Sequence, residues 1–581
     1  MKRSLVTGAV VATVLVAAGA LAWRGLSGPD VPQVAELLDA AQTVAFVSAE
    51  GLDGLVADAD HIAALLPDFV RSAAPDLFDP VARKARLGFD PATAAGWASA
   101  GLDARAGGAL VFDARMAQAG PAGTSVPIAL VRVHDAAALA ATATRMGGGK
   151  VVVDGAEGSV HPAQVAGLNG WSARISDWLA MAGPETPETA TAGMRAGLTA
   201  FAAGGGPSLA DDAAFRAAVA EAPEAPRVLA YVGVAGLTTW LQPTGGVAPG
   251  AMPGASGASQ VVAAATGQMG RLVRGLAVYK TPTGSGMRLV TTAEGASALR
   301  QCFVPARTPP HLARYVPRTG WAAVRVSVNL VEVLEGLLVL LPPEPFMLRA
   351  GVGGARLALA LATGIAWDDF GRALSGHGLV AVDQAASEVA VVDAVAAPTW
   401  RVILGVADPV AADALLAKVA ASLTKRAGVT TTPVTLGDAR GWSAAFGPVP
   451  AVAVRAGDVI VVAATTEDVQ RILALPAGES LAGTQAGDAL DGPAVVAVTA
   501  FPPAVAASAG TTPAAKPPVS KAEAQVLLRL VVDERGLHGT GPDAAGAALL
   551  AAVGRALFLR NVTGWLPTSA APGPATVAAA P

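Results

Sequence analysis

A four-residue sequence occurs twice in this chain and constrains the fold more than any other feature. Gly170-Trp171-Ser172-Ala173 returns as Gly441-Trp442-Ser443-Ala444, 271 positions later (441 minus 170). Only 10 of the 581 residues are Trp, so a repeat that contains one is harder to obtain by chance than a repeat of Ala and Gly alone. The sequence therefore predicts a tandem duplication.

Further landmarks return at a similar distance. Asp135 and Asp408 each follow an apolar run and precede an Ala-rich segment, 273 positions apart (408 minus 135). A carboxylate at such a place accepts hydrogen bonds from the first free backbone N–H groups of a helix and opposes the helix dipole. Pro409 suits the first turn of that helix. We therefore predict helix N-caps at Asp135 and Asp408.

Short apolar runs separated by turn residues predict the strands. In the first copy these are residues 43–49, 127–133, 150–154, 158–161, 171–175, 177–182 and 227–232. In the second copy they are residues 321–328, 401–406, 429–436, 442–446, 451–455, 458–463 and 494–499. A last β-hairpin in each copy turns at residues 282–286 and 533–536. Short, closely spaced strands favour an antiparallel meander over βαβ winding.

Helical periodicity accompanies these strands. Apolar residues recur at helical spacing over residues 51–70, and Asn329 is the predicted N-cap of a core helix that ends near residue 341. Further helices are predicted from Asp135 to residue 146 and from Asp408 to residue 425. The predicted fold class is α+β, with two tandem copies of a mostly antiparallel sheet with packed helices.

An uncharged apolar segment, residues 5–23, precedes both copies. Lys2 and Arg3 supply the positive flank that stays in the cytoplasm while the following chain crosses the membrane. Residues 20–22 (Ala-Leu-Ala) fit a cleavage site, yet the segment is almost as long as the ~20 residues that span a bilayer. Cleavage after Ala22 and retention as a membrane anchor both stay open. The predicted location is the periplasm or the cell envelope.

The predicted domain organisation follows from these features. Residues 1–30 form a signal peptide or membrane anchor, residues 34–300 the first copy, residues 301–317 a linker, residues 318–563 the second copy and residues 564–581 a disordered tail. Tracts rich in Pro, Gly, Ala and Ser occupy residues 242–259 and 502–520. Such tracts bury too little apolar surface to offset the entropy of ordering, so we expect mobile loops there.

Composition excludes several kinds of partner and site. The 41 basic and 45 acidic side chains give a net charge of −4, without the clustered Lys and Arg that binding to nucleic acid needs. Aromatic residues make up only 4%, which argues against a stacking platform for single strands or sugars. Cys302 is the single Cys, so the chain has no intrachain disulfide, no Cys-based zinc site and no Cys behind the apolar segment to carry a lipid.

Two short patterns resemble catalytic or phosphate-binding motifs without their context. Residues 422–425 (Ser-Leu-Thr-Lys) match S-x-x-K, in which a Lys activates a Ser nucleophile, but no Ser-Asp-Asn or Lys-Thr-Gly accompanies them. Residues 147–150 (Gly-Gly-Gly-Lys) lack the earlier Gly and the following Ser or Thr of a phosphate loop. We interpret the first as the end of a surface helix and the second as a helix-to-strand turn.

Titratable residues form one cluster that contains a His: Asp53, Asp58, Asp60 and His61. Weak binding of a divalent cation is conceivable there, but a solvated helix face is the favoured interpretation, because apolar residues occupy the opposite face. We therefore assign no catalytic, cofactor-binding or metal-binding residue and no cofactor.

Other conspicuous residues are expected to have structural roles. Asp211-Asp212 and Asp368-Asp369 are predicted at helix starts. Trp171 and Trp442 are predicted core anchors, because each lies on a strand with small neighbours that permit close packing.

Three segments resemble those of uncharacterised exported bacterial proteins grouped as a domain of unknown function. They are residues 310–317 (Pro-His-Leu-Ala-Arg-Tyr-Val-Pro), residues 87–91 (Leu-Gly-Phe-Asp-Pro) with 101–103, and residues 208–215 (Ser-Leu-Ala-Asp-Asp-Ala-Ala-Phe). The resemblance covers most of the chain loosely. It implies export and a duplicated α+β form, and it provides no catalytic residues.

The sequence leaves three functions open. The leading hypothesis is a non-enzymatic envelope protein that binds a partner protein or an apolar ligand between or within its two domains. A hydrolase-type enzyme is the alternative, with a site assembled from residues distant in sequence. A structural spacer is the third. Convergence of His134, His161 or the cluster at residues 53–61 on a cleft with another acid or nucleophile favours the enzyme.

Overall fold

The computed structural model describes most of the chain between residues 33 and 541. The described residues are 33–49, 51, 80–118, 126–145, 151–153, 155–165, 168–183, 191–220, 222, 226, 228–241, 267–281, 284–305, 307, 310–318, 322–341, 347–383, 399–446, 449–500 and 525–541. The predicted export segment, the helix over residues 51–70, the tracts at 242–259 and 502–520 and the tail therefore lie outside the described residues.

The chain divides into two compact units. Unit 1 comprises residues 1–210, 227–230 and 547–581, and unit 2 comprises residues 211–226 and 231–546. Of the predicted first copy, residues 34–300, the stretches 211–226 and 231–300 thus belong to unit 2.

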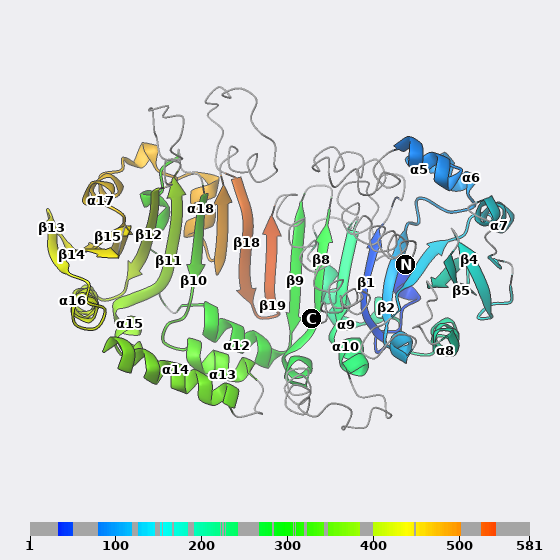
Figure 1. Ribbon diagram of the computed structural model, residues 1–581, viewed down its shortest axis with the longest axis horizontal. Coiled ribbons are helices and arrows are strands. Elements are labelled where there is room, and N and C mark those ends of the chain that lie inside the picture. The colour runs from blue at the N-terminus through cyan, green and yellow to red at the C-terminus, as the bar shows by residue number, and fades with distance from the viewer. Residues whose placement is uncertain are drawn as a thin grey trace, which may run out of the picture. The chain divides into compact units, whose positions relative to one another are not determined.

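Unit 1 combines an antiparallel sheet with short helices (Figure 1). Its strands are β1 (Thr43–Ala49), β2 (Gly108–Asp113), β3 (Ile128–Arg132), β4 (Val160–Val165), β5 (Leu168–Ile175) and β6 (Trp178–Ala182), and β1 also pairs with β7 (Val228–Gly233). Its helices are η1 (Gln33–Glu36), α5 (Pro80–Leu87), α6 (Ala94–Ser99), η2 (Ala114–Gln118), α7 (Ala136–Arg145), α8 (Thr191–Ala202) and η3 (Leu209–Asp211). The strands pair in the order β1-β2-β3-β6-β5-β4.

The strands of unit 2 form a longer antiparallel sheet. They are β8 (Val273–Lys280), β9 (Ser285–Thr291), β10 (Ala322–Ser327), β11 (Leu374–Asp383), β12 (Thr399–Val406), β13 (Thr431–Leu436), β14 (Ala439–Phe446), β15 (Val449–Ala456), β16 (Val459–Ala463), β17 (Val496–Ala500), β18 (Gln525–Asp533) and β19 (Gly536–Gly541). They pair in the order β8-β9-β19-β18-β17-β10-β11-β12-β16-β15-β14-β13. The β8–β9 hairpin therefore continues the sheet of the second predicted copy.

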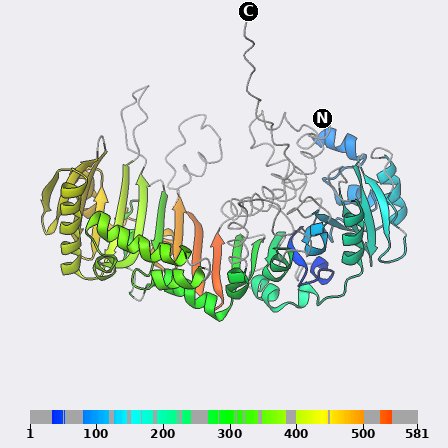
Figure 2. The same ribbon diagram turned by 60° about the horizontal axis from the view of Figure 1, so that its bottom comes forward.

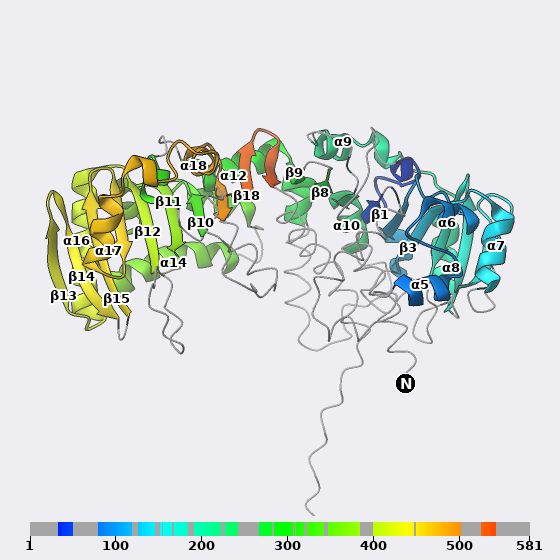
Figure 3. The same cartoon turned by 90° about the horizontal axis from the view of Figure 1, so that it is seen from above.

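Helices pack on both faces of this sheet and at its ends (Figures 1 and 3). They are α9 (Ala213–Val219), α10 (Val234–Leu241), α12 (Ala293–Phe303), η4 (Leu312–Tyr315), α13 (Val333–Leu340), α14 (Met347–Thr363), α15 (Trp367–Ala373), α16 (Pro409–Arg426), α17 (Thr466–Leu473), η5 (Ala477–Glu479) and α18 (Gln485–Asp491). Both units thus combine antiparallel sheets with helices, and the chain is an α+β protein.

Nearly every predicted strand that falls on described residues is present, with shifts of a few residues at the ends. Residues 151–153 are the exception, because Val151 and Val153 are buried but the segment forms no strand. Asn329 was predicted to cap a core helix, yet α13 begins only at Val333 and its N-cap is Glu332. The Asn329 side chain instead accepts a hydrogen bond from the Glu332 backbone N–H at 3.3 Å, which stabilises a turn before the helix. The core assignment is also wrong, since only Val333 and Gly336 of α13 are buried.

The predicted carboxylate caps are confirmed. Asp135 Oδ1 accepts hydrogen bonds from the backbone N–H groups of the second and third residues of α7, at 2.9 and 3.0 Å. Asp408 does the same for α16, at 2.9 and 3.2 Å, and Pro409 occupies the first helical position. Asp212 caps α9 by accepting from the Phe215 N–H at 2.8 Å. Each cap contributes about 1 kcal/mol to helix stability.

The two predicted copies share strand registers. Val131 pairs with Leu179 between β3 and β6, and the corresponding pair between β12 and β16 is Leu404 with Ile460. Two backbone hydrogen bonds also recur. Val133 N–H donates to the Asp177 carbonyl (2.8 Å), and Val406 N–H donates in the same way to the Asp458 carbonyl (2.7 Å). Leu209 N–H donates to the Leu38 carbonyl (2.7 Å), and Leu481 N–H donates to the Val316 carbonyl (2.8 Å).

The two predicted copies differ by one strand around the repeated tetrad. Trp171 lies on β5, which pairs directly with β6, whereas the strand of Trp442, β14, is separated from β16 by β15. Both indoles stand opposite a Pro on the preceding strand, Pro162 and Pro433. The tetrads therefore occupy the same hairpin position, and the second copy holds one more strand between that hairpin and β12.

Two layers of side chains flank the centre of the unit 2 sheet. The inner face, defined here as the one covered by η4, α17 and α18, carries a core that includes Ala323, Leu379, Ile403, Val461 and Ala497. The opposite, outer face is covered at one side by α12, which packs on β18 and β19, and at the other by α16, which packs on β13, β14 and β15. Between these helices lie β17, β10 and β11.

Candidate functional site

A surface of valines on the outer face of unit 2 is the candidate functional site. Directly paired residues form one continuous apolar row across six strands, Leu528, Val498, Val324, Val380, Val402 and Val462. A parallel row runs through Leu530, Val496, Val326, Gly378, Leu404 and Ile460. Five strand spacings of ~4.8 Å make each row about 24 Å long.

The middle of these rows is open to solvent. Val326 is 40% exposed and Val380 is 46% exposed. Val324, Val402, Val496 and Val498 are half-buried. We refer to these six residues as the valine patch. Contiguous exposed apolar surface on a protein marks a binding site more often than scattered apolar residues do.

The polar residues of the same strands point to the covered face. Arg325 and Ser327 of β10 are each only 1% exposed, and His377 of β11 is buried beside them. Arg325 Nη2 donates to His377 Nδ1 at 2.9 Å, and the Ser327 hydroxyl lies 3.0 Å from the same nitrogen. His377 Nε2 is 3.1 Å from the carbonyl oxygen of Arg307, and Arg325 Nη1 donates to the carbonyl of Gly492. Strand β10 thus has the reverse of the usual arrangement: its charged side chain, Arg325, is buried and Val326 is exposed. We call β10 the inverted strand for this reason.

This buried cluster fixes the protonation of its histidine. A guanidinium can only donate, so His377 Nδ1 is the acceptor, and Nε2, which faces a carbonyl oxygen, carries the proton. Burial lowers the pKa of His377, and the charge of Arg325 lowers it further, against the hydrogen bond to Arg307. Burial also lowers the pKa of Arg325 to about 10, and the charge of Asp491 offsets part of that shift. The imidazole is therefore neutral at pH 7.

The Ser327 and His377 pair has the separation of a nucleophile and its general base. Two features of this conformation oppose that role. The lone pair of Nδ1 is shared with the Arg325 guanidinium, and the serine hydroxyl is buried away from any substrate. In this conformation the cluster links β10, β11 and the segment around Gly492 through hydrogen bonds.

A second polar cluster joins β9 to β18 and β19. Arg288, which is fully buried, donates from Nη1 and Nη2 to both carboxylate oxygens of Asp533, at 2.7 and 2.9 Å. His538 Nδ1 lies 3.1 Å from Arg288 Nη1. Burial raises the pKa of Asp533, but the hydrogen bonds from Arg288 and the Arg535 backbone and the nearby positive charges lower it on balance. This ion pair connects the β8–β9 hairpin to the β18–β19 hairpin.

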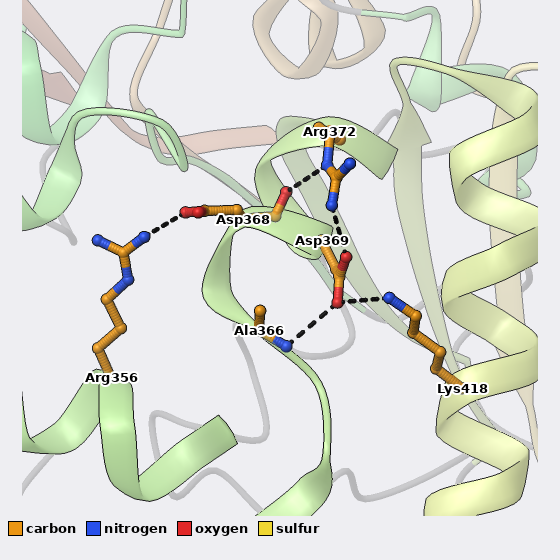
Figure 4. A network of polar contacts seen from close by, with 6 residues as sticks. All are labelled: Arg356, Ala366, Asp368, Asp369, Arg372 and Lys418. Carbon is orange, nitrogen blue, oxygen red and sulfur yellow. Dashed lines mark hydrogen bonds and ion pairs between the residues drawn. The ribbon is translucent and has the colours of Figure 1, made fainter. Parts of the chain in front are cut away.

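A third cluster surrounds the start of α15 (Figure 4). Asp369 accepts hydrogen bonds from Lys418 Nζ and Arg372 Nη2, both at 2.8 Å, and from the Ala366 backbone N–H at 3.1 Å. The Lys418 hydrogen bond is the main reason that the pKa of Asp369 is lowered. Asp368 pairs with Arg356 of α14 at 2.5 Å. The prediction that Asp368 and Asp369 lie at a helix start is confirmed, and these carboxylates also fasten α14 and α16 to α15.

The residues singled out in the sequence do not converge on a common site in the described structure. His134 is exposed at the end of β3, and His161 Nε2 lies 2.9 Å from the Ser159 hydroxyl in a turn. That hydroxyl donates to the Ala156 carbonyl at 2.5 Å, so its proton is already engaged. Residues 53–61 and 147–150 lie outside the described residues. Residues 422–425 form the last turns of α16, as predicted.

The tryptophans of the tetrad behave as packing residues. Trp442 is buried, in a cluster with Ala444, Ala453 and residues of α16, whereas Trp171 is only half-buried. Neither indole N–H has a hydrogen-bond partner among the described residues. The prediction of a core anchor is confirmed for Trp442. It is not confirmed for Trp171, whose ring has the Arg195 guanidinium carbon 5.5 Å from its centroid.

Sequence reasoning missed the valine patch and the buried arginines. A lone Arg within an otherwise apolar strand occurs at Arg288, Arg325 and Arg401, and all three are buried. Since a charge is rarely buried without partners, this pattern could have indicated polar networks inside the sheet.

The comparisons with known proteins give no match. No protein-family model, no curated protein and no solved structure matches the chain. Among the described residues no single helix is long and apolar enough to cross a membrane; one bent pair, Arg349–Thr363 with Trp367–Ala373, meets the length and composition test with an 85° bend.

Proposed function

We propose that this chain is a non-enzymatic protein of the cell envelope, exported by its N-terminal apolar segment, and that the valine patch binds an apolar ligand. The inverted strand β10 carries this proposal. Burying Arg325 costs desolvation energy, while leaving Val326 and Val380 in water forgoes about 1 kcal/mol or more at each residue. An apolar ligand on the patch removes Val326 and Val380 from water and thereby gains the burial free energy that the unliganded chain lacks.

We also propose that the two copies arose by duplication of one module. The shared registers and the matching backbone hydrogen bonds support it. The central apolar row recurs as well: its counterpart in unit 1 is Val47, Leu110, Ala129 and Met181, all half-buried and directly paired. A row that persists in both copies fits a surface used for binding, whereas a purely structural spacer has no need of it.

Hydrolysis is the competing function, and among the described residues the Ser327–His377 separation is the observation that favours it most, since the hydroxyl of the other close pair, Ser159 with His161, donates to the Ala156 carbonyl. Were these residues catalytic, a conformational change would have to open β10 and free His377 from Arg325. Trapping with a fluorophosphonate probe separates the two functions. We expect no Ser327-dependent labelling, and labelling that disappears in Ser327→Ala would replace the binding proposal with the enzymatic one.

The binding proposal predicts saturable uptake of an uncharged apolar fluorophore, 1-N-phenylnaphthylamine, by the purified full chain. We expect the double variant Val326→Glu/Val380→Glu to bind at least about tenfold more weakly, because a carboxylate loses hydration when an apolar molecule covers it. Fluorescence titration measures the dissociation constants. Both side chains are more than one-third exposed and neither belongs to the buried core, so we expect these changes to leave the core intact.

Val410→Glu is the matched control. Val410 is 78% exposed at the start of α16 and is not one of the six patch residues, and a carboxylate suits a helix N-terminus. It should bind the fluorophore like the unaltered chain. Equal binding by the double variant, with an unchanged thermal midpoint, refutes the patch as the site.

A further inference from the structure

Helix α14 exposes apolar side chains on its outward surface. Leu357 is 60% exposed and Leu361, one turn later, is 67% exposed. Gly351, Gly353 and Gly354 have open space where a Cβ would be. The helix packs against α13, α15 and α16, and Figure 2 shows it running across the ends of the strands with α13. Exposed leucines on one side of a helix indicate a surface that contacts another molecule.

The ends of α14 are nevertheless well fixed. Near its start Arg349 donates to the Leu341 carbonyl at 3.4 Å. At its end Arg426 of α16 donates to the Leu361 carbonyl, and Gly364 terminates the helix with a φ of +73°. The exposed leucines are therefore held in position and do not belong to a frayed segment.

The surroundings of α14 are basic. The 17 residues of the helix contain no Asp or Glu and two arginines, Arg349 and Arg356. The two carboxylates of the α15 start are both engaged by cations, Asp368 by Arg356 and Asp369 by Lys418 and Arg372 (Figure 4). Lys425 and Arg426 follow, exposed at the end of α16. Three cations thus face two carboxylates in the network. The neighbouring helix α13 adds two exposed carboxylates, Glu332 and Glu335. Positive charge still prevails around α14, with six cations (Arg349, Arg356, Arg372, Lys418, Lys425 and Arg426) against four carboxylates.

We propose that α14 lies on an anionic phospholipid surface, with Leu357 and Leu361 inserted among the acyl chains and the surrounding Arg and Lys side chains at the headgroups. An interfacial helix combines these two features, because buried apolar area and attraction to anionic lipid add to each other. Each Lys or Arg close to such a surface contributes about 1 kcal/mol. This inference rests on the proposed function, in which the export segment brings the chain to a membrane.

The test uses a fluorophore at position 361 of the full chain. Cys302 is fully buried and burial raises the pKa of its thiol to about 11, so an introduced cysteine reacts selectively. Leu361→Cys is labelled with an environment-sensitive nitrobenzoxadiazole dye and mixed with phosphatidylglycerol–phosphatidylethanolamine vesicles. Val410→Cys, labelled in the same way, is the control at the far end of α16. Lipids with a nitroxide on the acyl chain measure the depth of each dye.

We expect the dye at position 361 to brighten at least twofold and to be quenched by the nitroxide lipids, while the dye at position 410 stays unchanged. Phosphatidylcholine vesicles should give a weaker response, and Leu357→Gln should halve it with an unaltered thermal midpoint. An unresponsive dye at position 361 on chains that float with the vesicles overturns the proposal. Brightening on concentration without lipid also overturns it and indicates that a second copy covers α14. Binding of phenylnaphthylamine to the unlabelled chain is measured before vesicles are added, so failure of this inference is distinguished from failure of the proposed function.

Discussion

Replacing His377 by alanine is expected to lower the free energy of unfolding of unit 2 by about 3 kcal/mol, because it leaves the Arg325 guanidinium buried without one of its acceptors. Arg325→Met should cost at least about 1 kcal/mol less, since it removes the buried charge itself and keeps most of the side-chain volume. Urea denaturation gives the free energies, and hydrogen exchange of peptides from β10 and β11 assigns the loss to unit 2. A larger loss of stability for Arg325→Met than for His377→Ala would show that the stability of the cluster does not depend on hydrogen-bond acceptors for Arg325.

The same histidine should make unit 2 sensitive to acid. The pKa of His377 is lowered in the folded chain, whereas in the unfolded chain it is about 6.5. Above pH 6.5 both states are neutral and the full stability is present. As the pH falls below 6.5 the unfolded chain takes up the proton first, so stability is lost until the folded pKa is passed. The groups that face the ring, Arg325, Ser327 and the Arg307 carbonyl, offer no carboxylate to stabilise an imidazolium.

His377→Gln is the comparison for this pH dependence. It retains an amide that donates and accepts, and it removes the titrating group. We expect the free energy of unfolding of the unaltered chain to fall between pH 7 and pH 5 more steeply than that of His377→Gln. Parallel pH profiles would assign the acid sensitivity to other groups.

Local signals in the sequence were sufficient to predict much of the secondary structure. Apolar runs bounded by Gly, Pro and Asp gave the strands, and a carboxylate before an Ala-rich segment gave the starts of α7 and α16. These features are decided by residues close in sequence. The start of α13 was missed because Asn329 satisfies a turn as readily as a helix cap.

Local signals in the sequence do not predict which side chains of a strand lie on the buried face of the sheet. Alternation in β10 assigns Val324 and Val326 to a core and Arg325 and Ser327 to solvent. The structure has the reverse, because the partners of Arg325 come from β11 and from the turn after α18, more than 50 residues away in sequence. The valine patch follows from this reversal. A single sequence does not show that a distant histidine and carbonyl make the burial of a charge tolerable.

Replacing Asp533 by alanine is expected to lower the free energy of unfolding of unit 2 by about 2 kcal/mol, because the fully buried Arg288 loses the carboxylate that it grips with two hydrogen bonds. The value lies below the range for wholly buried pairs, since Asp533 itself is about one-third exposed. The pKa of Asp533 is lowered in the folded chain. Its contribution is therefore complete above pH 4 and is lost as the pH falls through the folded pKa, so unaltered and variant chains should converge at low pH.

Asp413→Ala is the matched control, because Asp413 is held by Arg455 in the same two-pronged geometry, at 2.6 and 2.8 Å, on the surface of unit 2. Its arginine is 17% exposed, whereas Arg288 is fully buried, so solvent reaches this pair and screens it. We therefore expect Asp413→Ala to cost at most about 1 kcal/mol. Arg288→Met tests the cause, since it removes the buried charge and should restore part of the stability when combined with Asp533→Ala. Equal losses for Asp533→Ala and Asp413→Ala would mean that Arg288 does not depend on its carboxylate, and that the β9–β19 pairing is held by its backbone hydrogen bonds.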